Sequence, residues 1–592
     1  MLKKFRIFKI FKNKSFRNLF AFDLMYQCAL ILVLIPFSKE LISLTFRFTK
    51  IGFFSVESVG NFLKSPVKII FLISIAVIFG ILKLFEINSF IFTCTQIKNK
   101  KDVTLLEIFN NSYKLLKIKF KKFYLFKNIF ILIFVIFNVP LRTYSHKKFV
   151  IPDYISSHFL QAKVGMLIFV LYILLFVIIS IKLILIYHIF IIENKTFFES
   201  IILSFKRTRK NIFKTIKIYF FIFLQIFLLK ILNIVFLLVI ILLFYGQTEN
   251  KVLSSVSIMV YFTIATGIKI ISNTICNFIV FNLVSKLYFT IHKEEVDLMV
   301  YPTNKIRAKM ALTLIFLVFA GSLSKYRSYI EEINFYHSFK NLKPDIMAHR
   351  GSTKNAPENT MEAINEAIEL GADFAEIDVM LTKDNVVVLS HDPNLKRLSH
   401  ENVKIKDLTF EELKKYKIKS KSLNKEFEFV DLKTVLENTK GKIKLNIELK
   451  PVSNDEQILA KEVSKLIQDK SYDVVVSSLS LKSLKEIEKI DPSISTGLIL
   501  AVAYGRFHNI PYVDFFCVEQ QFATTENIRK IHKNGKRVYV WTTNDISSLN
   551  EVLAKGVDGI ITDEVTLSKE ILTNEDFNFN EIIINKIISL IS

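Results

Sequence analysis

At 592 residues the chain is long enough for two or more domains, and its mean hydropathy of +0.37 is unusually high for a soluble protein. The net charge is +25, and Phe alone occurs 57 times. The Lys and Arg residues cluster between long apolar runs, which indicates a membrane protein and argues against nucleic-acid binding. Only Cys517 lies in the polar C-terminal half, so that half cannot contain an internal disulfide.

Residues 1–325 are predicted to form a multi-pass membrane domain of about seven α-helices. Seven runs approach the roughly 20 apolar residues that a helix needs to cross a bilayer. The first run lacks a small-residue cleavage site, so it is expected to remain in the protein. No string of carboxylates within these runs marks a proton relay. The predicted spans are 19–38, 67–92, 123–142, 164–191, 218–245, 254–285 and 308–324.

The distribution of basic residues predicts the orientation of these spans. With the N-terminus in the cytoplasm, the inside segments carry 28 Lys and Arg residues and the outside loops carry 9. The positive-inside rule favours that orientation. Seven crossings then put everything after about Tyr326 outside the cytoplasmic membrane. The inside segments are 1–18, 97–127, 193–217 and 286–309, and the outside loops are 38–66, 142–163 and 246–252.

Two of the inside segments, 108–123 and 197–216, mix apolar and cationic residues at helical spacing. Such helices can lie on the inner leaflet, where anionic lipid attracts them. They can equally be ordinary loop helices that pack on the membrane bundle. The sequence does not choose between these two interpretations.

The polar half, residues 343–575, alternates short β-rich runs with helical runs, a pattern that indicates a parallel sheet. Its length and the number of units predict a TIM barrel, in which functional groups lie at the carboxyl ends of the strands. The expected strands are 346–349, 374–379, 386–391, 443–449, 474–478, 496–500, 514–519, 538–542 and 559–562. The expected helices include 359–370, 455–469, 480–490, 524–534 and 546–555.

Nine strands are one too many for this barrel, and a hairpin explains the extra one. Asp384 and Asn385 form a turn signal, so the run 374–382 can pair with 386–391. If those two residues are the loop, Asp378 lies opposite His391 and Glu376 shares its face.

Three carboxylates at predicted strand ends, Glu376, Asp378 and Glu448, would meet at the mouth of the barrel. They would repel one another unless a cation neutralised them. A set of oxygen ligands suits a hard divalent ion, Mg²⁺ or Ca²⁺. The sequence therefore predicts a metal site.

Two histidines and two cations accompany the carboxylates. His349 and His391 can serve as general acid and general base, because imidazole titrates near neutral pH. Arg350 and Lys450 can hold an anion, and the planar guanidinium of Arg suits a phosphate. This combination is typical of a phosphodiesterase, and neither a nucleophile elbow nor a P-loop is present.

The segments "AHRG", "PENT", "EIDVMLTKD", "VVLSHD", "NIELK" and "VWTTN" occur in order over nearly the whole polar half. Together they resemble the glycerophosphodiester phosphodiesterases, and the N-terminal half resembles the membrane domain of some bacterial members. The resemblance implies hydrolysis of a glycerophosphodiester to glycerol 3-phosphate and an alcohol. It also implies a variable insertion at about 393–440, with a helix at "LTFEELKKYKI". The implied roles are acid and base for His349 and His391, metal ligands for Glu376, Asp378 and Glu448, phosphate contacts for Arg350 and Lys450, and a glycerol-pocket aromatic for Trp541.

Simpler roles remain open for several of these residues. Glu448 and Lys450 can form a structural ion pair, Lys450 can cover the rim, and Trp541 can belong to the barrel core. Glu358 and Asn359 are expected to cap the helix near Thr360 or to brace Arg350. The supporting residues are expected to be Asp392 beside His391 and Asp563 in a structural role, while His337, His400, His508 and His532 are expected at the surface.

Three functions compete. The leading one is a membrane-anchored hydrolase that faces outside and acts on glycerophosphodiesters, either lipid headgroups or a teichoic-acid-like polymer. A membrane transporter or scaffold whose barrel only binds such groups should have lost a catalytic residue, and none of the central groups is missing. A phospholipase acting on intact lipids is the third, and the "PENT" and "NIELK" segments favour the smaller substrates.

Overall fold

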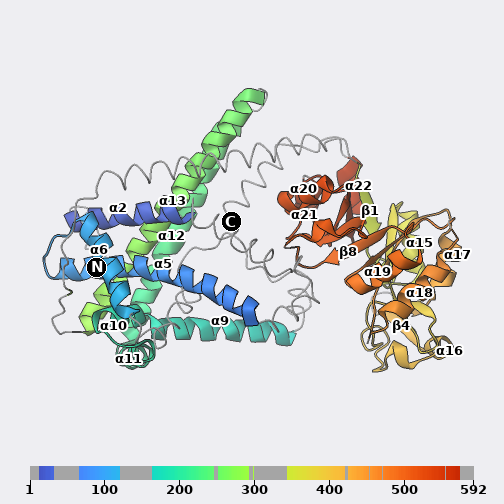
Figure 1. Cartoon of the computed structure of the whole chain (residues 1–592), viewed down its shortest axis with the longest axis horizontal. Helices are drawn as coiled ribbons and strands as arrows, with labels where there is room; N and C mark the ends of the chain where they lie inside the picture. The colour runs from blue at the N-terminus through green and yellow to red at the C-terminus, as the bar shows by residue number, and fades with distance from the viewer. Residues whose placement is uncertain are drawn as a thin grey trace. The chain divides into compact units, whose positions relative to one another are not determined.

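The computed structural model describes residues 13–31, 66–120, 163–245, 251–292, 298 and 343–573, apart from 421–424, 453, 470, 504 and 554. The chain divides into two compact units. One contains the described N-terminal helices and the other the described residues from 343 onward (Figure 1).

The N-terminal unit is helical, and four of its described segments are long and apolar enough to cross a membrane. They are Ala76–Lys98, Val170–Ile192, Ile212–Phe236 and Gly267–Ile291, and they overlap four of the predicted spans. The spans 123–142 and 308–324 lie outside the described residues, and 19–38 is described only to residue 31. The helices are α2 (Lys14–Ala29), α5 (Pro66–Lys98), α6 (Leu105–Lys119), α9 (Lys163–Leu183), α10 (Ile186–Ile192), α11 (Phe197–Lys210), α12 (Ile212–Tyr245) and α13 (Lys251–Ile291).

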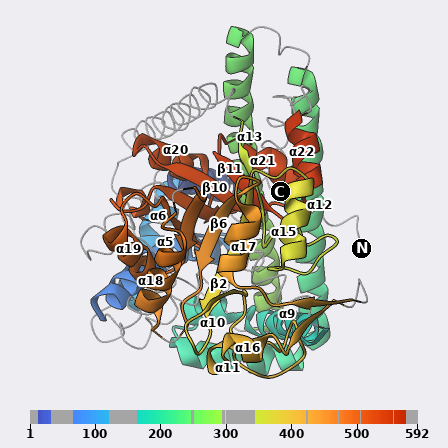
Figure 2. The same ribbon diagram turned by 90° about the vertical axis from the view of Figure 1, so that its right-hand side faces the viewer.

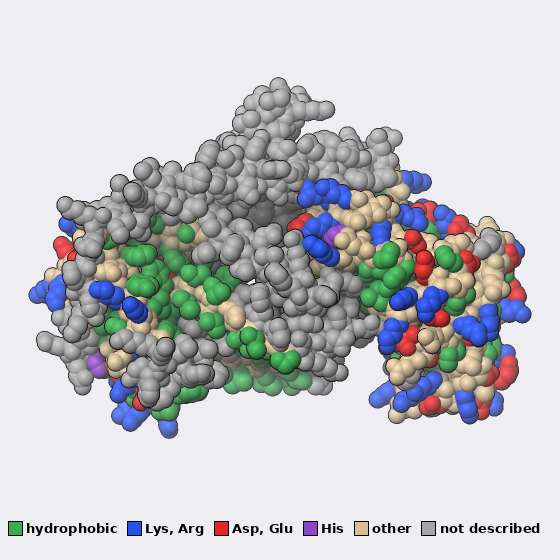
Figure 3. Space-filling view, viewed as in Figure 1, with side chains coloured by type: hydrophobic (Ala, Val, Ile, Leu, Met, Phe, Trp, Pro, Cys, Tyr) green, Lys and Arg blue, Asp and Glu red, His purple; other side chains and the backbone are tan. Residues whose placement is uncertain are grey.

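Both amphipathic segments form helices, α6 and α11, and each begins with a capping box. Helix α11 packs on the bundle through its small hydroxyl residues, and the Ser204 hydroxyl donates to the Lys182 carbonyl at 2.7 Å. Three of its large apolar side chains, Phe198, Ile202 and Phe205, stay exposed, whereas Phe197 is buried. Figure 3 shows such uncovered hydrophobic side chains over the N-terminal helices, in contrast to the mixed charged surface of the C-terminal unit.

A buried polar cluster joins α2, α5 and α13. The Asn277 amide donates to Asp23 at 2.9 Å and to Glu86 at 2.6 Å, and the Gln27 amide donates to Glu86 at 2.8 Å. Lys83 forms an ion pair with Glu86 at 2.6 Å. The sequence did not reveal this grouping, because its two carboxylates lie on different helices and meet only through packing.

The C-terminal unit confirms the predicted TIM barrel. Eight parallel strands follow the order β1-β11-β10-β9-β8-β7-β6-β2, and pairing of β1 with β2 closes the sheet. Helices lie outside the strands (Figures 1 and 2). The strands are β1 (Asp345–Ala348), β2 (Phe374–Leu381), β6 (Lys444–Leu449), β7 (Val474–Ser478), β8 (Thr496–Leu500), β9 (Phe515–Glu519), β10 (Arg537–Trp541) and β11 (Gly559–Thr562). The main helices are α15 (Met361–Glu369), α17 (Leu432–Thr439), α18 (Glu456–Leu466), α19 (Leu481–Ile490), α20 (Thr525–Lys533), α21 (Ile546–Leu553) and α22 (Val565–Thr573).

Alternation along the strands divides the barrel into two cores. Side chains such as Met347, Phe515 and Tyr539 fill the interior, and the intervening residues pack beneath the helices. All eight residues of β2 are buried, so the strand is apolar on both faces except where it carries Glu376 and Asp378. These carboxylates therefore point into the barrel, toward the carboxyl ends of the strands.

The predicted hairpin is present, but its register was wrong by one residue. The turn holds three residues, Lys383–Asn385, because Asn385 adopts a left-handed φ of 60° and Thr382 pairs with Val386. Strand β3 (Val387–Leu389) pairs with β2 accordingly. Ser390, and not His391, then lies opposite Asp378, since its amide donates to the Asp378 carbonyl at 3.0 Å.

The stretch 393–440 differs from the predicted insertion. Its expected helix is only the single turn α16 (Phe410–Leu413), and a β-hairpin follows, β4 (Lys417–Ser420) with β5 (Lys425–Glu428). The last part is α17, which packs on β3 as one of the barrel helices. In the sequence, the apolar residues of α17 form a short run interrupted by charged residues. This helix was therefore predicted as part of the insertion and not as a barrel helix.

Gly351, in the "HRG" segment, occupies a position that glycine alone tolerates. Its φ is 79°, and a Cβ there would lie 2.8 Å from Ala363 of α15. Gly441 has a similar φ of 70° but nothing within 4 Å of the same position. Gly351→Ala and Gly441→Ala should both incur the left-handed cost of about 1–2 kcal/mol, and only the first adds a steric clash. We expect a clearly larger fall in the melting temperature of the full-length protein for Gly351→Ala, and equal falls would contradict this account.

Candidate active site

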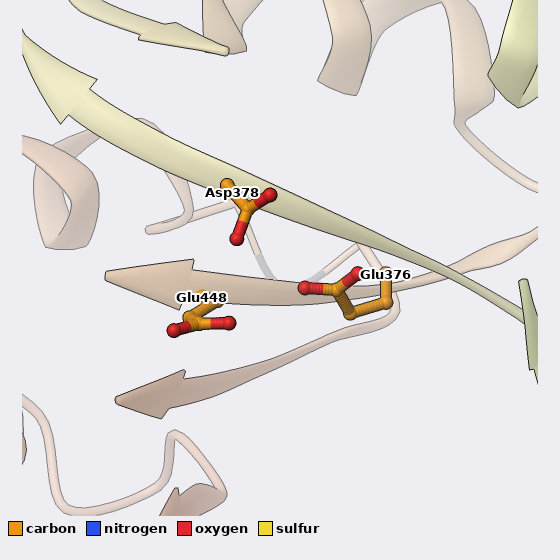
Figure 4. A group of neighbouring side chains, drawn as sticks. All are labelled: Glu376, Asp378 and Glu448. Carbon is orange, nitrogen blue, oxygen red and sulfur yellow. The ribbon is translucent and has the colours of Figure 1, made fainter. Parts of the chain in front are cut away.

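Three buried carboxylates meet at the carboxyl ends of neighbouring strands. Glu376 and Asp378 come from β2 and Glu448 from β6, where Asp378 lies directly beside Glu448 in the sheet register. One oxygen from each lies within 4.8 Å of the others. Figure 4 shows the three carboxylates turned toward one another. The fold thus confirms the prediction that these three carboxylates converge.

The electrostatics of this carboxylate group fit a cation. Burial, together with the negative charge of Asp378, raises the pKa of Glu376 to about 8. Burial also raises the pKa of Glu448. The pKa of Asp378 is instead lowered, because the charges of Lys450 and Arg350 outweigh the effect of its burial. Without a cation, these buried carboxylates do not all ionise. A hard divalent ion bound among their oxygens would favour the charged forms.

Lys450 lies among these carboxylates and does not cover the rim. Its ammonium group is 2.6 Å from Glu448 Oε1 and 3.2 Å from Asp378 Oδ1. The ion pair that the sequence left open is therefore present. Only 19% of the Lys450 side chain is exposed, and the two carboxylates raise its pKa despite burial. Lys450 can both offset the local negative charge and contact an anion.

His349 follows β1 and is oriented by a carboxylate. Its Nδ1 lies 2.8 Å from Asp563 Oδ1, and Asn544 donates to the other Asp563 oxygen at 2.6 Å. Burial lowers the pKa of His349, but the bond to Asp563 and the charge of Glu376 together raise it above its ordinary value. Asp563 was expected to have a structural role, and in the structure it holds the His349 imidazole.

His391 follows β3 and has the same arrangement. Its Nδ1 lies 2.7 Å from Asp392 Oδ1, as expected of a supporting residue. The preceding Ser390 amide donates to the Asp378 carbonyl at 3.0 Å, so the hairpin keeps His391 beside the strand that carries the carboxylates despite the shifted register. In both histidines Nδ1 is bound to a carboxylate, which leaves Nε2 as the nitrogen that can exchange protons with a substrate.

The "PENT" segment braces the site from the loop before α15. Arg350 donates to Glu358 at 2.9 Å, as predicted. Asn359 instead holds Asp378: its amide donates to the carboxylate, and its oxygen accepts from the Asp378 amide, both at 2.9 Å. Thr360 is the residue that caps the helix. Sequence spacing could not reveal the contact of Asn359, because it crosses from a loop to a strand.

Trp541 stands at the end of β10, partly buried against the interior core, with its indole N–H donated to the Cys517 carbonyl at 3.0 Å. This contact agrees with the barrel-core role, and the glycerol-pocket role stays a prediction. Glu519 was missed by the sequence analysis. It ends β9, is paired with Trp541 in the sheet register and is 2% exposed.

The remaining histidines differ in part from the prediction. His400 is exposed, as expected. His532 is not a surface residue, because its Nε2 lies 2.8 Å from Asp558 and only 11% of its side chain is exposed. His508 is half-buried, and His337 lies outside the described residues.

Family comparisons agree with this geometry. Residues 349–567 match the glycerophosphoryl diester phosphodiesterase family, and residues 4–323 match the membrane domain of glycerophosphoryl diester phosphodiesterase. The second match alone spans more than half of the chain.

Individual relatives cover the C-terminal unit. A glycerophosphodiester phosphodiesterase of Caldanaerobacter subterraneus is 31% identical over 239 residues, which are 38% of this chain and 95% of the relative. One of Bacillus altitudinis is 32% identical, covering 37% of this chain and 94% of its own length. A lysophospholipase D of Mus musculus is 29% identical, with 38% and 86% covered.

Among solved structures, an Oleispira antarctica phosphodiesterase in complex with the product sn-glycerol-3-phosphate is 25% identical with a TM-score of 0.37, covering 40% of this chain and 98% of that one. From the two family matches and the relatives, the chain is a phosphoric diester hydrolase that belongs to the glycerophosphoryl diester phosphodiesterase family and carries that family's membrane domain.

Proposed function

We propose that the protein is a membrane-anchored enzyme that hydrolyses glycerophosphodiesters to glycerol 3-phosphate and an alcohol, with Mg²⁺ or Ca²⁺ as cofactor. The observation that carries this proposal is the buried carboxylate group of Glu376, Asp378 and Glu448. Two histidines, each bound to a carboxylate through Nδ1, stand beside it. The test is whether the purified protein releases glycerol 3-phosphate and whether histidine variants lose that release.

His349 and His391 are the general base and general acid of this proposal. One Nε2 accepts the proton of the attacking oxygen, which is either water or the substrate's own glycerol hydroxyl. Attack by the hydroxyl gives a cyclic phosphate, which water then opens to glycerol 3-phosphate. The other donates a proton to the alcohol oxygen as its bond to phosphorus breaks. A cation bound to Glu376 would offset the negative charge that helps to raise the pKa of His349. The pKa of His349 would then be lower, which favours the neutral imidazole that a base needs. We therefore assign the base to His349 and the acid to His391.

Glu376, Asp378 and Glu448 would hold the divalent cation, which when bound stabilises negative charge on phosphoryl oxygens. Arg350 and Lys450 bind the phosphate in this proposal, and Trp541 lines the glycerol pocket. Arg350 is suited to the task because Glu358 fixes one end of its guanidinium group. The alcohol is either a lipid headgroup or part of a teichoic-acid-like polymer.

The domain limits are part of the proposal: a membrane domain over 1–325 with about seven spans, and a barrel domain over 343–575. The N-terminus lies in the cytoplasm and the barrel outside the membrane, because 28 of the basic residues counted at span ends then lie inside and 9 outside. Substrate would in that case come from the outer surface of the cell.

Protease added to intact spheroplasts should remove the C-terminal half of the protein. A tag at the N-terminus, on the cytoplasmic side, should stay protected until the cells are lysed. Survival of the barrel in intact spheroplasts, followed by its digestion after lysis, would reverse the proposed orientation.

A further inference from the structure

Arg397, in the segment that follows His391, joins two carboxylates from different parts of the barrel. Its guanidinium group donates to both oxygens of Glu358, at 2.6 Å and 2.7 Å. Its Nε donates to Asp392 at 2.6 Å. Although 41% of the side chain is exposed, three hydrogen bonds from one planar group form a fork that a single surface ion pair lacks.

Each of these carboxylates also holds a residue of the proposed site. Glu358 accepts from Arg350 at 2.9 Å, and Asp392 lies 2.7 Å from His391 Nδ1. The chain of contacts therefore runs from Arg350 through Glu358, Arg397 and Asp392 to His391. Arg397 joins its two halves directly by binding Glu358 and Asp392 at once. A second, longer route passes through Asp378, which lies 3.4 Å from Arg350 and whose carbonyl accepts from the Ser390 amide.

The segment that presents Arg397 is itself anchored. Leu395 is 1% exposed, and its amide donates to the Val403 carbonyl at 2.9 Å. The Ser399 amide closes the turn by donating to the Leu395 carbonyl at 2.8 Å. Leu395 belongs to a small apolar core that packs on the face of the β2–β3 hairpin that carries Met380 and Val388. The core consists of Met380, Val388, Leu395, Ile405, Leu413, Ile418, Phe427 and Phe429.

The two carboxylates stay charged in this arrangement. Burial works to raise the pKa of Glu358, but the hydrogen bonds from Arg397 and the charge of Arg350 lower it below its ordinary value. The pKa of Asp392 is lowered by its bond to His391 and further by Arg397. Without Arg397, Glu358 and Asp392 would be two negative charges beside the site with one partner each.

We propose that Arg397 is a positioning residue, which holds the phosphate-binding Arg350 and the proton-donating His391 in one geometry through Glu358 and Asp392. The inference rests on the proposed function and extends it to a residue outside the family motifs described above. Arg397 touches neither substrate nor metal ligands in this role. It makes the turn that carries Arg397, anchored by Leu395 and Ser399, part of the catalytic geometry.

The test is a kinetic comparison of full-length variants with glycerophosphocholine as substrate. Arg397→Gln should lower kcat/KM roughly 10–100-fold, the range typical of residues that orient active-site groups. Arg397→Lys keeps the charge but cannot donate to three oxygens of two carboxylates, so it should recover little of the loss. Lys417→Gln, which breaks an exposed ion pair with Glu428 in the same segment, should keep wild-type activity and serves as the matched control.

A double-mutant cycle separates positioning from a general loss of stability. In a His391→Ala background the effect of Arg397→Gln should shrink, because one of its two routes to the site is already gone. Equal losses in both backgrounds, wild-type activity of Arg397→Gln, or full recovery in Arg397→Lys would each overturn the inference. Failure of the wild-type protein to release glycerol 3-phosphate would instead overturn the proposed function.

Discussion

His349→Ala and His391→Ala should each lower kcat on a glycerophosphodiester by about 10²–10⁴, the usual contribution of a general acid or base. The double variant should lose much less than the product of the two single losses, since both groups act on one transition state. Both variants should fold, because each imidazole is held by only one described carboxylate contact, to Asp563 or to Asp392.

The matched control is His400→Asn. His400 is exposed and has a φ of 63°, which asparagine tolerates, so this variant should keep wild-type activity. A substrate with an acidic nitrophenol leaving group needs no proton donor and should restore activity only to the variant that lacks the acid, which we expect to be His391→Ala. Near wild-type turnover of both alanine variants on ordinary substrates would refute the acid and base roles.

Removal of divalent cations should abolish activity, and Mg²⁺ or Ca²⁺ should restore it. The stabilisation that a metal ion gives to a phosphoryl transition state is worth several kcal/mol, so a loss of roughly 10²-fold or more is expected. Glu376→Gln and Asp378→Asn should lower both activity and metal affinity, measured by calorimetric titration of the full-length protein.

Glu411→Gln provides the control for these carboxylate variants, because Glu411 is an exposed residue that pairs only with Lys414 among its described partners. It should change neither activity nor metal affinity. Full activity in the presence of a chelator would contradict the metal site. Glu376, Asp378 and Glu448 would then be balanced by Lys450 and Arg350 alone.

Much of the barrel could be predicted from sequence, because each strand is a short apolar run with its own turn and helix signals. The predicted runs 474–478, 496–500 and 559–562 coincide with β7, β8 and β11. The stretch 393–440 was harder, since its fold depends on the small core beneath the β2–β3 hairpin and not on local periodicity. The hairpin register failed for a local reason: Asn385 adopts a left-handed conformation, which makes a three-residue turn.

The site was predictable where residue type and strand position coincide. Glu376, Asp378 and Glu448 follow from alternation on two strands, and the parallel register brings them together. Contacts between loops could not be foreseen. Asn359 on Asp378 and Arg397 on Glu358 link residues whose separation along the chain carries no structural pattern.

The most direct test of the account is product analysis with purified full-length protein in the presence of Mg²⁺ or Ca²⁺. Glycerophosphocholine, glycerophosphoglycerol and a polyglycerophosphate are supplied separately, and released glycerol 3-phosphate is measured. The account predicts that wild-type protein releases glycerol 3-phosphate from at least one of them and that the double variant of His349 and His391 does not. Absence of glycerol 3-phosphate from all three substrates, or equal release by the double variant, would contradict it.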